Sequence, residues 1–289
     1  MLNTKKILIT GASSGFGQLA VDLLLKRGHH VLAGVRGGQP RLESVFPEHR
    51  AAISSGQLHA VDLHVDQPKT FQRAKDTIQK QFGGRLDVLI NNAGYGVMAP
   101  IESQSPEQLR GQMEVNFFGP LLLTRALMPE LRAARGRILN ISSIAGLMSF
   151  PFYASYNASK FALEGLTEAM HYELEPFGIQ IGMIEPGAFK TGFVKVSLGV
   201  SDELAGAGSP YQSRLEKFNR VLRTKGSIMG GNPIRVARLI VKLCEKRRIP
   251  MRNIIGTDAW LMNLVRRLLP ESLRVALVSF AFRKLLLRE

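Results

Sequence analysis

Short apolar runs alternate with longer amphipathic stretches along the first two thirds of the chain. Each apolar run is only a few residues long and is bounded by glycine or polar residues, which predicts a short buried strand. The stretches between the runs repeat their apolar residues at helical spacing. The predicted strands are residues 7–10, 31–35, 58–61, 86–90, 137–141 and 179–184, and the predicted helices are residues 17–27, 68–82, 106–132 and 153–175.

This alternation predicts an α/β fold in which a parallel, doubly wound sheet carries helices on both faces. Residues 1–256 are expected to form one domain. Within it, residues 188–232 scatter glycine, serine and proline among apolar residues, which indicates a long insertion or lid rather than a separate domain. Residues 257–289 form a basic tail in which Pro270 separates two amphipathic helical segments.

Composition limits the classes of protein that fit. The 289 residues are 45% hydrophobic, enough for a sizeable core, and the single cysteine, Cys244, excludes an internal disulfide. The apolar run near the N-terminus is too short for a signal peptide, and no run of about 18 apolar residues predicts a spanning helix. We therefore expect a cytoplasmic protein, with contact to a membrane surface left open.

The net charge of +15 is concentrated at the C-terminal end. Residues 235–289 hold thirteen Lys and Arg against four Asp and Glu, more than half of the whole excess. A basic balance is typical of proteins that bind nucleic acid, anionic membranes or acidic ligands. Because the rest of the chain is far less basic, the sequence argues against nucleic-acid binding.

A glycine-rich segment, Thr10–Gly17, follows the first predicted strand and opens the first predicted helix. Glycine lets the backbone approach a pyrophosphate closely, and a helix N-terminus offers free N–H groups and the positive end of its dipole. The spacing Gly-x-x-x-Gly-x-Gly differs from the commoner Gly-x-Gly-x-x-Gly fingerprint. The segment therefore predicts a dinucleotide site, the alternative being a plain turn between strand and helix.

Arg36 directly follows the second predicted strand, whose end reaches the adenine ribose in such sites. An acidic residue there favours NAD, whereas a guanidinium suits the 2′-phosphate of NADP. No acidic residue occupies this strand end, so NADP(H) is the expected cofactor. The alternative is a solvated arginine in a loop.

Tyr156 and Lys160 are four residues apart on a predicted helix and so share one face. A tyrosine acting as an acid–base catalyst near neutrality needs a pKa lowered from about 10, and a neighbouring ammonium acts in that direction. Such pairs also occur on exposed helices without function. Here Ser142 and Ser143 end the fifth predicted strand, and the asparagine Asn116 lies inside a long helix.

Taken in order, these motifs resemble the short-chain dehydrogenase/reductase family over roughly residues 5–195. The resemblance implies a single-domain Rossmann-like sheet of about seven strands and an oxidoreductase acting on CH–OH groups. It also implies roles: Tyr156 as proton donor or acceptor, Ser143 bonding the substrate oxygen, Lys160 holding the nicotinamide ribose, and Asn116 supporting a proton relay. The implied cofactor contacts are Gly11, Ser13, Ser14, Gly15, Phe16, Gly17, Arg36, Asp62, Leu63, Asn92, Ala93, Gly94, Tyr156, Lys160, Pro186, Gly187 and Thr191.

Residues 92–96 and 185–191, together with Arg36 after the second predicted strand, further resemble the branch that contains hydroxysteroid and retinol dehydrogenases. This implies a hydrophobic substrate, namely a steroid, a retinoid, or a long-chain aldehyde or ketone. Five apolar side chains could line the substrate site, although each could equally pack in the core. They are Phe150, Phe152, Phe189, Phe193 and Met229. No metal is expected, because the six histidines form no ligand cluster and Cys244 suits a buried helix position.

Arginines lie beside large apolar residues in the tail, a composition that suits a peripheral membrane helix, an oligomer contact or a flap over an apolar pocket. The family implies a homo-oligomer. An alternative function is a nucleotide-binding scaffold or sensor that docks partners or membrane through this tail. The complete set of catalytic residues speaks against that alternative.

Overall fold

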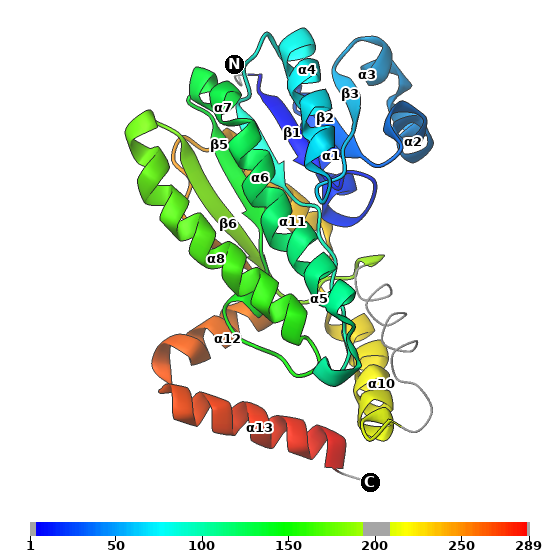
Figure 1. Ribbon diagram of the computed structural model, residues 1–289, viewed down its shortest axis with the longest axis vertical. Coiled ribbons are helices and arrows are strands. Elements are labelled where there is room, and N and C mark those ends of the chain that lie inside the picture. Colours follow the sequence, from blue (N-terminus) through cyan, green and yellow to red (C-terminus); the bar gives the residue numbers. More distant parts are fainter. Residues whose placement is uncertain (1–3, 193–208, 288–289) are drawn as a thin grey trace.

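The computed structural model describes residues 4–192 and 209–287. Seven parallel strands form one sheet in the order β3-β2-β1-β4-β5-β6-β7 (Figure 1). In chain order the strands are β1 (Lys6–Thr10), β2 (His30–Val35), β3 (Leu58–Asp62), β4 (Val88–Asn91), β5 (Arg137–Ile141), β6 (Gln180–Pro186) and β7 (Arg252–Ile255). The strand order reverses between β1 and β4, so the carboxyl ends of these strands flank the crevice where doubly wound sheets bind ligands.

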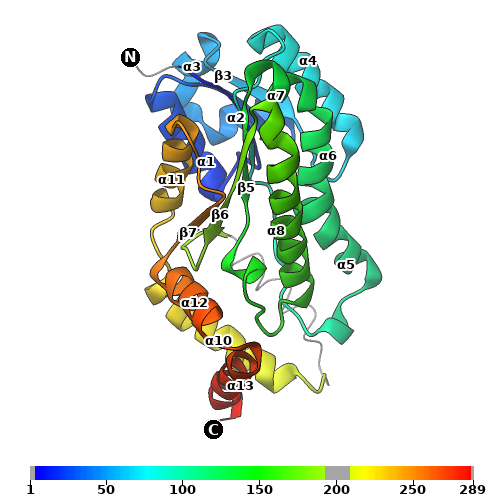
Figure 2. The same ribbon diagram turned by 90° about the vertical axis from the view of Figure 1, so that its left-hand side faces the viewer.

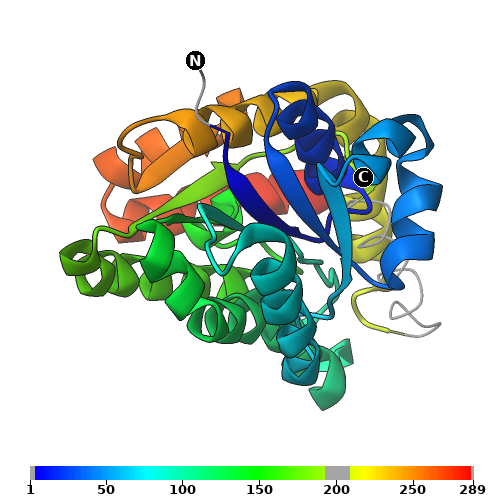
Figure 3. The ribbon, with the colours of Figure 1, turned by 90° about the horizontal axis from the view of Figure 1, so that it is seen from above.

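Helices cover both faces of the sheet, as Figure 3 shows from above. One layer contains α1 (Gly15–Lys26), α2 (Gly38–Val45) and α11 (Ile234–Glu245). The other contains α4 (Phe71–Phe82), α6 (Gly119–Ala126), α7 (Met128–Ala134) and α8 (Ala154–Leu174). The predicted α/β architecture is therefore confirmed.

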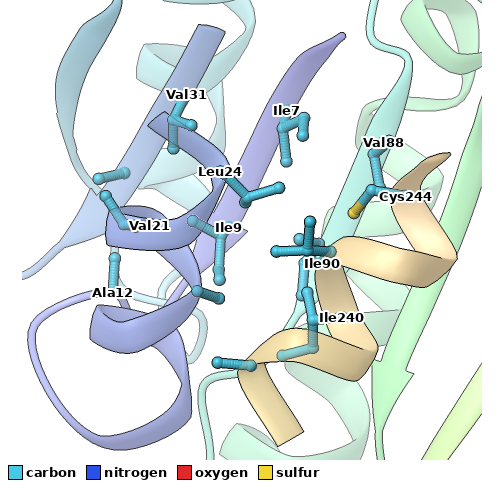
Figure 4. Close-up of a cluster of buried hydrophobic side chains, with 14 of the residues drawn as sticks. Ile7, Ile9, Ala12, Val21, Leu24, Val31, Val88, Ile90, Ile240 and Cys244 are labelled. Carbon is cyan, nitrogen blue, oxygen red and sulfur yellow. The ribbon is translucent and has the colours of Figure 1, made fainter. Parts of the chain in front are cut away.

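The strands supply side chains to both layers because successive residues of a strand point to opposite faces. Ile7 and Ile9 of β1 pack on the α1 and α11 side, while Leu8 packs on the α4 and α6 side. Figure 4 shows Leu24 of α1 and Ile240 of α11 among these strand residues. Two separate apolar cores thus hold the sheet in place, and its carboxyl edge is left for polar groups.

The predicted helix over residues 106–132 is interrupted. It consists of α5 (Pro106–Met113), a π-helical turn (Glu114–Phe118), α6 and α7. Pro120 cannot donate the backbone hydrogen bond that the Asn116 carbonyl would accept in an α-helix, and Gly119 donates five residues back to Glu114 instead. The interruption therefore lies where the sequence combines Asn116 with Gly119 and Pro120.

Several elements escaped the sequence pattern. These are α2, α3 (Arg50–Ser54) and the edge strand β7, while α11 contains the buried helix position expected for Cys244. The segment interpreted as an irregular lid, residues 188–232, contains helix α10 (Gln212–Met229), which corrects that part of the prediction. Residues 193–208 of the same segment lie outside the described residues.

The tail forms two helices that meet at Pro270, as predicted, but the second is not amphipathic, because its apolar residues are spread around the helix. They are α12 (Thr257–Leu268) and α13 (Glu271–Leu287). In Figures 1 and 2, α13 lies beyond the end of α8 and next to α10, on the side of the molecule to which the carboxyl edge points. Across the described ranges, no helix is both long and apolar enough to span a bilayer.

Candidate active site

The glycine-rich segment forms the turn from β1 into α1. Gly11 and Gly15 have φ values of 63° and 57°, a region that side chains rarely adopt. At Gly17 there is no room for a side chain, because a Cβ atom would lie 2.6 Å from Asn92 Nδ2 and would overlap the Gly11 carbonyl oxygen. Ser14 precedes α1 in an extended conformation, and the first turn of the helix holds no acidic residue. The helix N-terminus is thus suited to an anion.

Asn92 supports this turn from the end of β4. Its Nδ2 donates to the carbonyl oxygens of Thr10 and Gly11 at 2.9 and 3.1 Å. In return, Thr10 Oγ1 accepts from the backbone N–H groups of Asn92 and Ala93, each at 3.0 Å. The side-chain amide of Asn92 is therefore occupied by the loop, and any contribution to cofactor binding is through the loop's shape.

Asp62 at the end of β3 forms hydrogen bonds and an ion pair, whereas Arg36, which follows the neighbouring strand β2, does not do so within the part of the chain that the structure describes. Asp62 accepts the Gly37 N–H at 2.9 Å and pairs with Arg73, and this backbone hydrogen bond holds the pKa of Asp62 below its ordinary value. Leu63 beside it is buried. The Arg36 side chain is exposed and has no partner among the described residues. An exposed guanidinium therefore directly follows β2.

Tyr156 and Lys160 lie in the first two turns of α8, and both are buried, with 8% and 5% of their surface exposed. Lys160 Nζ donates to the Ile141 carbonyl oxygen at 2.8 Å and lies 5.8 Å from the centre of the Tyr156 ring. Ser143, which follows β5, forms a side-chain hydrogen bond with Tyr156. The structure brings these three predicted residues together at the carboxyl edge of the sheet.

The pKa of Tyr156 differs from the sequence expectation. Burial raises it to about 12, and the hydrogen bond with Ser143 acts in the opposite direction. Burial lowers the pKa of Lys160 to about 8. Desolvation disfavours both the tyrosine phenolate and the lysine ammonium. At Tyr156 this effect is larger than the lowering of the pKa that we expected from Lys160. At neutral pH the phenol is a proton donor and the lysine remains largely an ammonium.

Asn116 is buried in the π-helical turn, and its side chain joins three segments. Its Oδ1 accepts the Tyr95 N–H at 3.1 Å, and its Nδ2 donates to the Tyr95 carbonyl oxygen at 2.9 Å and to Ser159 Oγ at 3.0 Å. A Cβ atom on Gly94 would lie 3.2 Å from Asn116 Oδ1 and 3.7 Å from Lys160 Nζ. The Asn116 amide thus positions α8 beside the loop that follows β4.

The turn after β6 is held by a residue that the sequence did not single out. Asp258, in the first turn of α12, accepts the Ala188 N–H at 2.6 Å, and its carboxylate occupies the space where a Cβ atom of Gly187 would lie. Gly187 donates to the Ile255 carbonyl oxygen at 2.9 Å. In the sequence, Asp258 is recognisable only as an acidic residue near the start of a helix. Nothing in the sequence connects it with Ala188, which is 70 positions away.

The same turn faces the phosphate loop. A Cβ atom on Gly15 would lie 4.0 Å from Thr191 Cβ, and the Phe189 ring packs edge-on against Phe16 with centroids 5.8 Å apart. Thr191 therefore lies beside the phosphate loop, and the cofactor contacts expected from Pro186 and Gly187 stay predictions. Phe189 belongs to the buried core on the α1 side, which is the core-packing alternative given for it.

Helix α12 also supports the serine turn. Ala259, fully buried, and Met262 pack against Ile144 and Leu147, which directly follow Ser143. The first helix of the tail is therefore part of the framework of the site, although the sequence suggested a separate segment from residue 257.

Aromatic side chains gather beside the catalytic helix. Phe152 has a φ of 65° and lies 5.4 Å from Phe218 of α10 and 5.6 Å from Phe282 of α13, between ring centroids. Tyr211 lies 6.4 Å from the same ring. This aromatic cluster joins the segment before α8 to α10 and α13. Of the other expected lining residues, Phe150 is partly buried against the serine turn, while Phe193 and the Met229 side chain lie outside the described residues.

No metal centre is found among the described residues, where no three His, Cys, Asp or Glu side chains gather to hold an ion. Cys244 is fully buried in α11, and burial raises the pKa of its thiol to about 12.

Comparison with known proteins shows the family and agrees with the fold. The family model described as short chain dehydrogenase matches residues 5–198. The 3-ketodihydrosphingosine reductase of Bacteroides thetaiotaomicron is 36% identical over 86% of this chain and 87% of its own length. A short-chain dehydrogenase structure from Streptomyces avermitilis has a TM-score of 0.77 at 30% identity, covering 97% of this chain and 98% of its own. A short chain dehydrogenase from Burkholderia cenocepacia, solved in complex with NADP, has a TM-score of 0.73 at 25% identity, covering 96% and 98%.

Gly17→Ala tests the packing of the phosphate loop. The new methyl group would collide with the Gly11 carbonyl and the Asn92 amide, so the loop must shift, and we expect dinucleotide affinity to fall about tenfold or more, which corresponds to roughly 1.4 kcal/mol. A fluorescence titration measures it. The control is Gly165→Ala on α8, where nothing lies within 4 Å of the added carbon and the affinity should not change. Unchanged affinity in both variants would contradict this view of the loop.

Proposed function

The chain belongs to the short chain dehydrogenase family, and we propose that it is an NADP(H)-dependent oxidoreductase that reduces the carbonyl group of a hydrophobic substrate. The observation that carries the proposal is the buried Tyr156–Lys160 pair beside Ser143, at the carboxyl edge of the sheet and opposite the glycine loop. Family membership alone supports an oxidoreductase with a nicotinamide cofactor. The preference for NADP(H), the direction and the substrate class are our proposals.

The residues present fit such a cofactor. The loop from Gly11 to Gly17 and the start of α1 suit a pyrophosphate, since the glycines leave the backbone open and the N-terminus carries the positive end of the helix dipole. Arg36 would hold the 2′-phosphate, and Lys160 the nicotinamide ribose. When bound, the cofactor supplies the hydride.

Tyr156 provides the proton. Because burial keeps its phenol protonated at neutral pH, it is ready to donate to the oxygen of a carbonyl as that oxygen gains charge. Ser143 already bonds to the phenol and can donate to the same oxygen. The phenolate that remains is stabilised by the nearby Lys160 ammonium, an interaction that is stronger in a dry site than in water. This arrangement suits reduction better than oxidation, which would start from the phenolate.

The aromatic cluster supports an apolar substrate. Phe152 and Phe218 present rings close to the start of α8, and such surfaces recognise hydrocarbon rather than charge. The Bacteroides relative is named a 3-ketodihydrosphingosine reductase. Among steroids, retinoids and long-chain carbonyl compounds, we therefore place ketones of lipid-like substrates first.

Tyr156→Phe tests the mechanism. It removes the proton donor while keeping the ring, so turnover of a panel of lipid ketones, steroids and retinals with NADPH should fall at least a thousandfold, within the range known for general acid catalysis. NADPH binding should remain. Tyr153→Phe is the matched control, because its ring lies only 6.0 Å from Tyr156 and it should keep activity within a few-fold. Full activity of Tyr156→Phe would refute the proposed chemistry.

Arg36→Ala tests the cofactor preference. A charge-assisted hydrogen bond contributes about 1.5–3 kcal/mol, so NADPH should bind roughly ten- to a hundredfold more weakly, with NADH binding unchanged. Arg50→Ala, which removes an exposed arginine from α3, serves as the control for net charge. If the wild-type protein binds NADH more tightly than NADPH, the assignment of Arg36 is wrong.

We further propose that α12 and α13 contact an anionic membrane surface. Large apolar side chains on these two helices are exposed to solvent, namely Trp260, Leu261, Leu268, Leu273, Val275, Leu277 and Phe280. Their described charged side chains comprise five basic and two acidic residues, and one of the acidic ones, Asp258, is engaged with the Pro-Gly turn. Apolar residues flanked by cations match the boundary of an anionic bilayer. Phe282 of α13 meets Phe152, so this surface adjoins the aromatic cluster.

Vesicle sedimentation tests this contact with point variants, because deleting residues from 257 onward would remove the Asp258 support of the site. Replacing Leu273, Leu277 and Phe280 by serine should weaken binding to phosphatidylserine-containing vesicles by about tenfold or more, since burying each such side chain contributes about 1.5–3 kcal/mol. Replacing Phe161, Tyr172 and Phe177, exposed elsewhere, should not. Equal sedimentation of both triple variants removes the membrane proposal. A tail variant that instead dissociates an oligomer would show that a second copy covers the surface.

A further inference from the structure

A buried cluster of charged groups lies behind the catalytic pair. Glu164 is one helical turn beyond Lys160 on α8 and 5% exposed, and Glu185 of β6 is fully buried. Arg252 of β7 lies between them, and Glu168 completes the set from the next turn of α8. The resemblance to known dehydrogenases assigned no role to any of these residues.

The ion pairs leave two oxygens without partners. Arg252 NH1 contacts Glu164 Oε2 at 2.5 Å and Glu185 Oε1 at 2.8 Å, and its NH2 contacts Glu168 Oε2 at 3.2 Å. Glu164 Oε1 and Glu185 Oε2 are buried and have no hydrogen-bond donor. A Cβ atom on Gly146 would lie 3.1 Å from Glu164 Oε1, so the small residue leaves room for this carboxylate.

The charge balance requires a proton. If both buried glutamates were ionised, two carboxylates would lie against the single guanidinium of Arg252, and one buried negative charge would have no contacting cation of its own, which is costly. Carboxylates only accept hydrogen bonds, so two of them cannot bond to each other unless one is protonated. One proton shared by Glu164 and Glu185 brings the set to neutrality.

We propose that Glu164 and Glu185 hold one proton between them, and that Glu164 acts through Lys160 as a positioning residue that keeps the lysine in its ammonium form. The inference rests on the proposed function of the Tyr156–Lys160 pair and extends it. The proton resides mainly on Glu185, the more deeply buried of the two, so that Glu164 carries the charge that faces Lys160.

The electrostatics agree with this assignment. Burial lowers the pKa of Lys160 to about 8, and the negative charge of Glu164 acts against that lowering. Burial raises the pKa of Glu185 to about 7. The proton of the pair is therefore held on Glu185, and Glu164 carries the negative charge that opposes the loss of the Lys160 proton. The other charged groups facing Glu164 are Glu168 and Arg252, and the serine turn contributes only the uncharged Ser142 and Gly146.

The test is the pH profile of kcat/KM with saturating NADPH in the full-length protein. In E164Q the alkaline limb should move down by about one pH unit, which makes kcat/KM about fivefold lower at pH 8, because the charge nearest to Lys160 is lost. E185Q is the buried control: it breaks the same pair but leaves the Glu164 charge, so the limb should stay within about 0.3 unit. E168Q removes an equally charged but half-exposed group one turn further away and should behave like E185Q.

Unfolding curves and NADPH titrations show whether each variant remains folded and loaded. If the alkaline limb of the kcat/KM profile moves equally in E164Q and E185Q, the cluster has a purely structural role and the proposal is overturned. An alkaline limb that does not move in E164Q also overturns it. If E164Q cannot be purified folded, the titration of a ¹³C-labelled lysine signal in E185Q and wild type decides, since a lowered Lys160 pKa in E185Q contradicts the inference. Failure of the proposed function itself would appear separately, as full activity in Tyr156→Phe.

Discussion

Lys160 donates to the Ile141 carbonyl oxygen at the end of β5, with 2.8 Å between the two atoms. A buried ammonium must be hydrogen-bonded or it loses its proton, so this contact ties the catalytic helix to the carboxyl edge of the sheet. Tyr156 precedes it by one turn and meets Ser143, two residues beyond Ile141. The position of one cation thus aligns helix, strand and phenol.

Burial of Tyr156 and Lys160 also shifts their pKa values, and a neighbouring charged residue opposes the shift at Lys160. Desolvation raises the pKa of Tyr156 and lowers that of Lys160, so the pair tends towards its neutral forms. A neutral phenol suits a proton donor, but a neutral lysine would not stabilise the phenolate. Glu164, held by Arg252 from the far edge strand, supplies the opposing charge. The acid cluster is therefore an extension of the catalytic pair rather than a separate feature.

The tail has two roles that meet at α12. Its inner side carries Asp258 and Ala259, which hold the turn after β6 and the serine turn, while Trp260 and Leu261 are exposed. Contacts on the outer side of this short helix therefore act close to the groups that would surround nicotinamide.

The sequence by itself determined the alternating strands and helices, the glycine loop and the ordered catalytic residues, because these depend on local spacing: period two in strands, four residues between Tyr156 and Lys160, and glycines at a turn. Only the tertiary structure decided that Asn92 supports the loop, that residues 106–132 break at a π-helical turn, and that Asp258 and Glu164 belong to the site. Arg252 and Glu164 are 88 residues apart, and Ala188 and Asp258 are 70 apart. No periodicity links such positions, and burial, which shifts the pKa values of Tyr156 and Lys160, exists only once the chain has packed.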